Sequence, residues 1–184
     1  MPAPRILLRT PRLVFRDFTT ADVDRLVELD ADPEVMRYIS KGRPTPRETF
    51  INDVLPRWFA FQARQPPQGF WAAHLGDDGP FIGWFHLRPD KLVPEEMELG
   101  YRLHRRFWGQ GLATEGSRAL VETGFREWNM GKISARTLVT NLTSQRVMAK
   151  AGLQFEAYFD YPEAWLPDWT AEERKAVKFS RVRA

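Results

Sequence analysis

Two carboxylates open the segment whose residue types and spacing best suit chemistry, EMELGYRLHRRFWGQGLATE. From Glu96 to Leu103 polar and apolar residues alternate, which predicts a half-buried strand with Glu96 and Glu98 on one face. An alkyl amine has a pKa of about 10, so it must lose a proton before it attacks an acyl group, and a carboxylate can accept that proton. We therefore interpret Glu98 as a general-base candidate. The alternative is a rim carboxylate that attracts a cation or pairs with an arginine.

A basic turn and a glycine-rich loop follow this strand. The basic side chains are those of Arg102, His104, Arg105 and Arg106. Gly109 and Gly111 then lead into a helical pattern that begins near Leu112. A helix N-terminus offers unpaired N–H groups and partial positive charge, and glycine lets an anion approach the backbone. The pattern is neither a P-loop nor GxGxxG, yet it predicts a diphosphate-binding turn. The alternative is a structural turn whose glycines only allow close packing.

The bulk composition predicts one globular domain over residues 1–184. Its 43% hydrophobic and 28% charged residues are ordinary globular values. The sequence has no cysteine, which excludes disulfides and cysteine nucleophiles, and its three histidines lack metal-ligand spacing, so we expect no metal site. The chain has no signal-peptide core and no run of about 18 apolar residues. We therefore expect a cytoplasmic protein without a membrane segment.

Strands and helices alternate along the chain. We predict strands at 13–18, 70–75, 81–87, 96–103, 133–139, 153–161 and 177–182. Helices are predicted after caps at Thr19 or Thr20, Asp32 and Thr45, and at 112–128 and 142–151. A hairpin turn is expected at 76–79, and Pro56 should kink or break the third helix near 53–55. This order predicts a single mixed α/β sheet domain.

The motif Arg-x-x-Gly-x-Gly, preceded by Glu-x-Gly-Tyr, resembles the coenzyme A signature of the GNAT superfamily of acyl-CoA N-acetyltransferases. The longer string LGYRLHRRFWGQGLATEG is most similar to the Rim-type subgroup of ribosomal-protein N-terminal acetyltransferases. Further segments resemble that subgroup in the same order: LRTPRLVFRDFTTADVDRL, DPEVMRYI, FIGW and NLTSQRVMAKAGLQ. The resemblance covers nearly the whole chain. It implies a mostly antiparallel central sheet of about seven strands, flanked by helices and splayed after the Glu-bearing strand.

The resemblance also implies acetyl-CoA as co-substrate. The backbone of Leu103, His104 and Arg105 would pair with pantetheine, and the turn at Arg106 would help hold the pyrophosphate. The remaining cofactor-binding residues that it implies are Gly109, Gly111, Leu112, Ala113, Thr114 and Asn141. As the residue between a strand and a helix, Asn141 is also a favoured N-cap.

The departing thiolate needs a proton or a hydrogen bond. Many GNAT enzymes use a tyrosine four residues after the position that matches Ser144, but here that residue is Met148, which cannot donate. In the Rim-type subgroup the serine of Asn-x-x-Ser is the proposed acid, which makes Ser144 the candidate. The alternative is a first-turn helix cap. Arg146 and Lys150 either reach the adenosine phosphates or form a solvated helix face.

The leading interpretation is acetyl transfer from acetyl-CoA to a primary amine, on a protein N-terminus or a small molecule, by direct attack in a ternary complex. The first helices and the loop 162–170 should form the acceptor site, where Glu163 and Asp168 could steer a cation.

One alternative is a non-catalytic CoA-binding regulatory module, which the missing tyrosine at 148 favours. Nucleic-acid binding through residues 102–106 ranks last, because the net charge is only +3 and no Lys/Arg-rich tract occurs. A homodimer is consistent with the resemblance.

Overall fold

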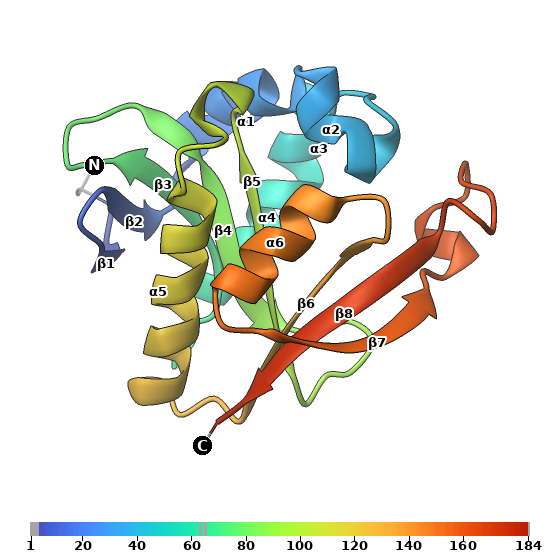
Figure 1. Ribbon diagram of the computed structural model, residues 1–184. Helices are drawn as coiled ribbons and strands as arrows, with labels where there is room; N and C mark the ends of the chain where they lie inside the picture. Colours follow the sequence, from blue (N-terminus) through green and yellow to red (C-terminus); the bar gives the residue numbers. More distant parts are fainter. Residues whose placement is uncertain (1–3, 63, 65, 184) are drawn as a thin grey trace.

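A single mixed sheet forms the centre of the structure, a computed structural model that describes residues 4–62, 64 and 66–183 (Figure 1). Over these residues the sheet has eight strands in the order β1-β2-β3-β4-β5-β6-β8-β7. The strands are β1 (Ile6–Arg9), β2 (Leu13–Asp17), β3 (Gly69–Leu75), β4 (Phe81–Pro89), β5 (Met97–Leu103), β6 (Lys132–Leu138), β7 (Gln154–Asp160) and β8 (Lys175–Val182). Neighbouring strands are antiparallel except β5 and β6, which are parallel.

The predicted mixed, mostly antiparallel sheet is confirmed, with one strand more than the seven that the sequence indicated. The additional strand is β1, a short edge strand whose residues are exposed or half-buried. Four residues without a buried face leave no alternation for a pattern to detect, which is why the sequence did not reveal it. No helix in the described part of the chain is long and apolar enough to cross a membrane.

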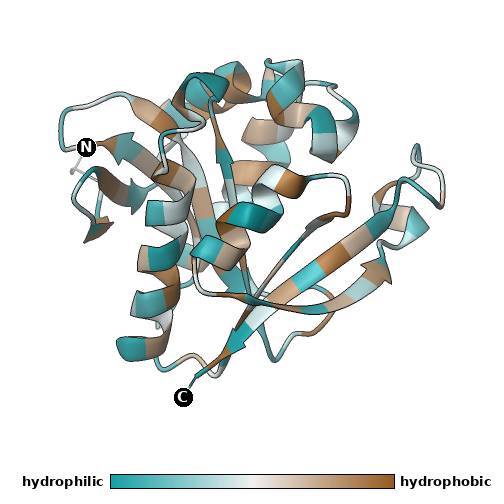
Figure 2. Cartoon of the chain, viewed as in Figure 1, coloured by the Kyte–Doolittle hydropathy of each residue, from teal (hydrophilic) through white to brown (hydrophobic). Residues whose placement is uncertain are grey.

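Helices cover both faces of the sheet. The longer ones are α1 (Val23–Asp30), α2 (Pro33–Ser40), α4 (Leu55–Gln62), α5 (Leu112–Arg126) and α6 (Leu142–Lys150). Single turns lie at η1 (Thr20–Asp22), α3 (Arg47–Thr49), η2 (Phe50–Val54), η3 (Arg105–Phe107) and η4 (Glu163–Trp165). One hydrophobic core lies between the sheet and α5 and α6, and a second lies between the other face and the helices from α1 to α4. The hydrophobic and hydrophilic residues that alternate along α5 in Figure 2 reflect this one-sided burial.

Local capping predictions have mixed outcomes. Asp32 caps α2 through a hydrogen bond from the Glu34 N–H to its Oδ1 (2.9 Å), as predicted. The predicted cap at Thr45 is wrong: Pro46 is the N-cap, and the Thr45 hydroxyl instead donates to Asp30 Oδ2 at 2.6 Å. The buried Asp30 carboxylate requires hydrogen-bond donors, and this requirement outweighs the local capping pattern.

The irregularity predicted near Pro56 is present as a π-helical turn over η2 rather than as a break. A π-turn shifts the hydrogen-bond pattern by one residue, which accommodates a residue that lacks an N–H group. The helical run from α3 through η2 to α4 therefore stays continuous.

The sheet splays between β5 and β6. Strand β5 pairs with β4 along its whole length, but with β6 only at Met97–Ile133 and Glu98–Ser134. From Leu99 onward the two parallel strands diverge, which leaves one edge of β5 without a neighbouring strand. This divergence, which we call the fork, follows the Glu-bearing strand β5, in agreement with the splay that the resemblance implied.

Gly100 lies in β5 directly beside His86 of β4. A Cβ atom at Gly100 would lie 2.1 Å from His86 Nε2. The His86 ring is buried between Phe70 and Trp84, so it has no free space to move into. Glycine at this position of the Glu-x-Gly-Tyr motif is therefore required by packing.

We predict that Gly100→Ala lowers the unfolding free energy by about 1–3 kcal/mol and the Tm by roughly 3–10 °C, because the added methyl group overpacks this contact. Thermal unfolding monitored by circular dichroism measures the change. Gly131→Ala is the matched control, since nothing lies within 4 Å of its Cβ position and its φ is outside the left-handed region. Equal melting temperatures for the two variants would contradict the packing argument.

Candidate functional site

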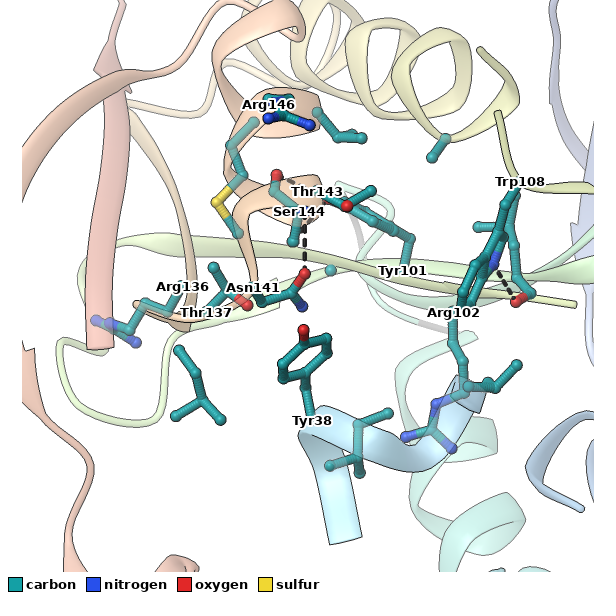
Figure 3. Close-up of a pocket in the computed structure, with 18 of the residues that line it drawn as sticks. Tyr38, Tyr101, Arg102, Trp108, Arg136, Thr137, Asn141, Thr143, Ser144 and Arg146 are labelled. Carbon is teal, nitrogen blue, oxygen red and sulfur yellow. Dashed lines mark hydrogen bonds between the residues drawn. The ribbon is translucent and has the colours of Figure 1, made fainter. Parts of the chain in front are cut away.

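A cleft of about 970 Å³ opens at the fork. Strands β5 and β6 and helices α5 and α6 border one end, and α2 and the segment after β7 border the other. Figure 3 shows Tyr101, Asn141, Thr143 and Ser144 converging on it, with Tyr38 reaching in from α2. The cleft therefore lies where the sheet has an unpaired strand edge.

The glycine-rich loop forms one wall of the cleft. Gly109 and Gly111 have φ values of 73° and 77°, in the left-handed region that favours glycine. A Cβ at Gly109 would have no atom within 4 Å, and one at Gly111 would meet only Arg12 Nη2 at 3.5 Å. Because the space above both glycines is open, close packing does not explain them. An anion can approach the backbone here.

Helix α5 begins in this wall with Gly111 as its N-cap. Its first-turn residues Leu112, Ala113 and Thr114 line the cleft. The first N–H groups of an α-helix have no acceptor within the helix, and the helix dipole adds positive charge there. The start of α5 thus has the properties of a phosphate site.

Hydrogen bonding shows which backbone groups of β5 face the fork. The N–H of His104 donates to Ile82 O of β4, and its carbonyl accepts from the Phe107 N–H, both at 2.9 Å. Antiparallel pairs alternate between hydrogen-bonded and non-hydrogen-bonded, so the register of β4 and β5 turns the polar groups of Leu99, Tyr101 and Leu103 toward the fork. Of these carbonyls, that of Leu103 accepts from Trp108 Nε1 (2.9 Å).

This arrangement revises part of the predicted cofactor set. Leu103 lines the cleft, but both backbone groups of His104 already have protein partners. Arg105 and Arg106 form the η3 turn beyond the end of β5, outside the described lining of the cleft. Trp108, which sequence reasoning missed, lines the cleft instead. No local signal distinguished Trp108, since its indole is fixed by a carbonyl five residues earlier.

Asn141 and Ser144 lie together at the start of α6. Asn141 Oδ1 accepts a hydrogen bond from the Ser144 N–H at 3.2 Å, which confirms the N-cap. The Ser144 hydroxyl lies 2.9 Å from the Tyr101 hydroxyl, and Tyr101 also donates to the Ser144 carbonyl at 3.2 Å (Figure 3). Asn141 therefore caps the helix through the Ser144 N–H, whereas the Ser144 hydroxyl contacts Tyr101.

Tyr101 is a second cleft residue that sequence reasoning did not assign. Burial raises the pKa of Tyr101 to about 12, and the hydrogen bond with Ser144 only partly offsets this effect. The phenol is therefore protonated at neutral pH and can act as a donor. Its place in the Glu-x-Gly-Tyr motif was the available signal.

The Glu98 side chain lies on the face of β5 opposite to that of Tyr101, outside the described lining of the cleft. Arg88 Nη2 is 2.5 Å from its carboxylate, and the two side chains are 13% and 16% exposed. Burial raises the pKa of Glu98, the Arg88 guanidinium opposes that effect, and Asp90 reinforces it. The arginine pairing considered as an alternative is thus present, together with a pKa shift in the direction that suits a base.

Glu96 belongs to a different cluster of charged side chains from Glu98. It precedes β5, and its carboxylate lies 2.9 Å from Lys132 Nζ and 2.8 Å from Lys178 Nζ. These lysines belong to β6 and β8, so Glu96 links the start of β5 to both strands at the closed end of the fork.

The other end of the cleft is lined mainly by aromatic and basic side chains. Tyr38, Lys91, Arg136, Tyr161 and Trp165 are among them.

The carboxylates expected to steer a cation lie elsewhere. Asp168 pairs with Arg43, and Glu163 lies 3.7 Å from Arg174. Trp169 lines a separate, smaller cavity of about 560 Å³ beside Lys41 and Glu173. Of the acceptor residues suggested by the 162–170 loop, only Trp165 and Leu166 border the main cleft.

Arg102 is unavailable to a nucleic acid. Its guanidinium pairs with the buried Asp30 carboxylate and lies over the Trp84 ring. In the described part of the chain, no group of three or more His, Cys, Asp or Glu is arranged to hold a metal ion.

Comparison with known proteins agrees with this geometry. An acetyltransferase named FsC-acetyl coenzyme A-N(2)-transacetylase, from Aspergillus fumigatus, is 33% identical over 143 residues, which cover 73% of this chain and 59% of that protein. The crystal structure of a GNAT-family acetyltransferase from Bacillus anthracis superposes with a TM-score of 0.76 at 22% identity, over 97% of this chain and 98% of that one. A RimL ribosomal L7/L12 alpha-N-protein acetyltransferase in complex with coenzyme A gives 0.77 at 16% identity, over 97% and 98%.

At these identities the two structures show a shared fold. The profile of the acetyltransferase (GNAT) domain family matches residues 12–154. Because that profile spans most of the chain, the protein belongs to the acetyltransferase (GNAT) domain family.

Proposed function

We propose that the protein transfers the acetyl group of acetyl-CoA to a primary amine, on a protein N-terminus or a small molecule, by direct attack in a ternary complex. One observation carries the proposal: the unpaired edge of β5 leads, within the same cleft, to the open backbone at the start of α5. An extended amide-containing arm that ends in a diphosphate is the ligand that such a path fits. The Rim-type subgroup remains part of the proposal, supported by the similarity to RimL.

The residues that would hold acetyl-CoA follow from this path. The backbone groups of Tyr101 and the N–H of Leu103 face the fork and would bond the pantetheine amides, in place of the backbone groups of His104 and Arg105. The N–H groups from Gly109 to Thr114 would bind the pyrophosphate, and the Asn141 amide would contact the arm. Arg146 and Lys150, which also line the cleft, would meet the adenosine phosphates.

The reaction needs a base and a donor. Acetyl-CoA supplies the activated thioester. Glu98, directly or through water, would accept the proton of the ammonium group so that the neutral amine attacks the carbonyl carbon. As the carbon–sulfur bond breaks, the Ser144 hydroxyl would donate to the sulfur, while the Tyr101 hydroxyl donates to Ser144.

The regulatory-module alternative depends on Met148, which is buried beside the cleft and cannot donate. The hydroxyls of Tyr101 and Ser144 provide a donor near the same place, so Met148 is weak support for lost turnover. Release of free thiol from acetyl-CoA in the presence of an amine panel separates the two functions. The homodimer stays a prediction.

We predict that acetyl-CoA at about 100 times its Kd stabilises the protein by roughly 2.7 kcal/mol and raises the Tm by roughly 5–10 °C. Gly109→Leu should abolish this shift, because its side chain would occupy the open space beside the loop backbone. Gly76→Leu is the matched control: Gly76 has a φ of 72°, nothing within 4 Å of its Cβ position, and a place in the β3–β4 hairpin turn. A wild-type Tm that does not change in millimolar acetyl-CoA would refute the proposed cofactor.

We predict that Glu98→Gln lowers kcat by roughly 100- to 10,000-fold, because the general base is lost. Burial raises the pKa of Glu98 and Arg88 opposes it, so Arg88→Leu should raise that pKa further. A base acts only when ionised. The pKa read from the acid limb of the wild-type pH profile of kcat/KM should therefore lie above the ordinary Glu value, and it should move to higher pH in Arg88→Leu.

Glu96→Gln provides the control for these measurements, since it removes a carboxylate two residues away that belongs to the lysine cluster. Its kcat and acid limb should stay near wild type even if its Tm falls. An acid limb that does not move in Arg88→Leu would show that another group is the base.

A further inference from the structure

An ion pair connects the N-terminal part of the chain to the start of α5. Glu115 Oε1 accepts hydrogen bonds from Thr10 Oγ1 at 2.6 Å and from the Arg12 N–H at 3.0 Å. Its Oε2 accepts from Arg12 Nε at 2.6 Å. The Glu115 side chain is only 17% exposed. Burial alone would raise the pKa of Glu115, but the bonds from Thr10 and Arg12 lower it overall, so the carboxylate is charged at neutral pH.

The same arginine also contacts the glycine-rich loop. Arg12 Nη1 donates to the Gln110 carbonyl at 2.9 Å. Arg12 Nη2 lies 3.5 Å from the Cβ position on Gly111. Arg12 is not among the described residues that line the cleft, so it contacts the loop from behind. The Gln110 carbonyl is thereby directed toward a cation and away from the anion site.

The backbone of Arg12 is itself fixed. Its carbonyl accepts from the Gly76 N–H at 2.9 Å, in the turn between β3 and β4. Thr10 closes the turn between β1 and β2, where its hydroxyl oxygen accepts from the Leu13 N–H at 2.9 Å. The guanidinium therefore extends from a backbone segment that is hydrogen-bonded to the sheet, and not from a free chain end.

The loop needs such a restraint. Gly109 and Gly111 flank Gln110, and neither glycine has a side chain that could pack against a neighbour and fix the loop. Glycine loses more conformational entropy than other residues when it is ordered, and a loop ordered in advance spares that cost on binding. A lone carboxylate in the first turn of α5 would also repel a nearby phosphate, whereas the pair with Arg12 is neutral.

We propose that Arg12 and Glu115 are positioning residues for the pyrophosphate of the acyl-CoA donor: together they hold the Gly109–Gly111 loop in its anion-binding form from outside the cleft. The inference rests on the proposed function.

Arg12→Met tests it with two donors. The variant loses a charged hydrogen bond to the loop and the charge that offsets Glu115, so KM for acetyl-CoA and the calorimetric Kd for CoA should each rise about tenfold. The KM for S-acetylpantetheine, a donor that ends before the pyrophosphate, should change less than twofold. The kcat and the KM for the amine should stay near wild type. A residue that only supports the fold would not separate the two donors.

Arg9→Met is the matched control. Arg9 belongs to the same N-terminal segment, is 51% exposed against 47% for Arg12, and pairs with Asp77. This variant should leave the KM for both donors and the Kd for CoA near their wild-type values. If Arg12→Met does not fold, Glu115→Gln provides the second variant, with a several-fold rise in the Kd for CoA and no change for S-acetylpantetheine.

An unchanged Kd for CoA in a folded Arg12→Met protein would overturn the inference, and so would an equal loss with both donors. If wild-type protein binds CoA but turns over no amine, the proposed function fails, while the CoA titrations still decide this inference.

Discussion

The short parallel contact between β5 and β6 is the constraint on which the site depends. Only two residue pairs join these strands, at Met97–Ile133 and Glu98–Ser134. Charged groups hold the contact from both sides. Below it Glu96 binds two lysines, and beside it the fully buried Asp90 pairs with Arg136 of β6 and approaches Ser134 Oγ at 3.4 Å. Because the fork borders a cleft and not another strand, it presents backbone polar groups of β5 to whatever occupies that cleft.

Local sequence patterns predicted the parts of the site that local physics controls. A helix N-cap at Asn141 and a hairpin turn at 76–79 each arise from the conformational preferences of a few consecutive residues, and the structure has them where the patterns placed them. A splay after the Glu-bearing strand was also predicted, but from the resemblance and not from periodicity. Nothing in the alternation of residues 96–103 shows that one edge of that strand is unpaired.

Strand register and distant partners explain what the sequence could not show. The parity of the β4–β5 register decides that Leu103, and not His104, turns its backbone toward the fork. The contact of Glu98 with Arg88 joins the neighbouring strands β5 and β4, and that of Thr45 with Asp30 joins the segment before α3 to α1. Likewise, the ion pair of Asp168 with Arg43 removes a carboxylate that appeared free in the sequence.

The two faces of β5 separate the proposed base from the proposed donor. Glu98 shares its face with Gly100, which contacts His86 on the side of α1 and α4. Tyr101 lies on the opposite face with Phe85, next to α5, and reaches Ser144 of α6. The proposed base must reach the nitrogen of the attacking amine and the proposed donor must reach the departing sulfur, which are two different atoms bound to one carbonyl carbon. Residue alternation along one strand, at an edge without a neighbouring strand, provides this separation without any movement of the fold.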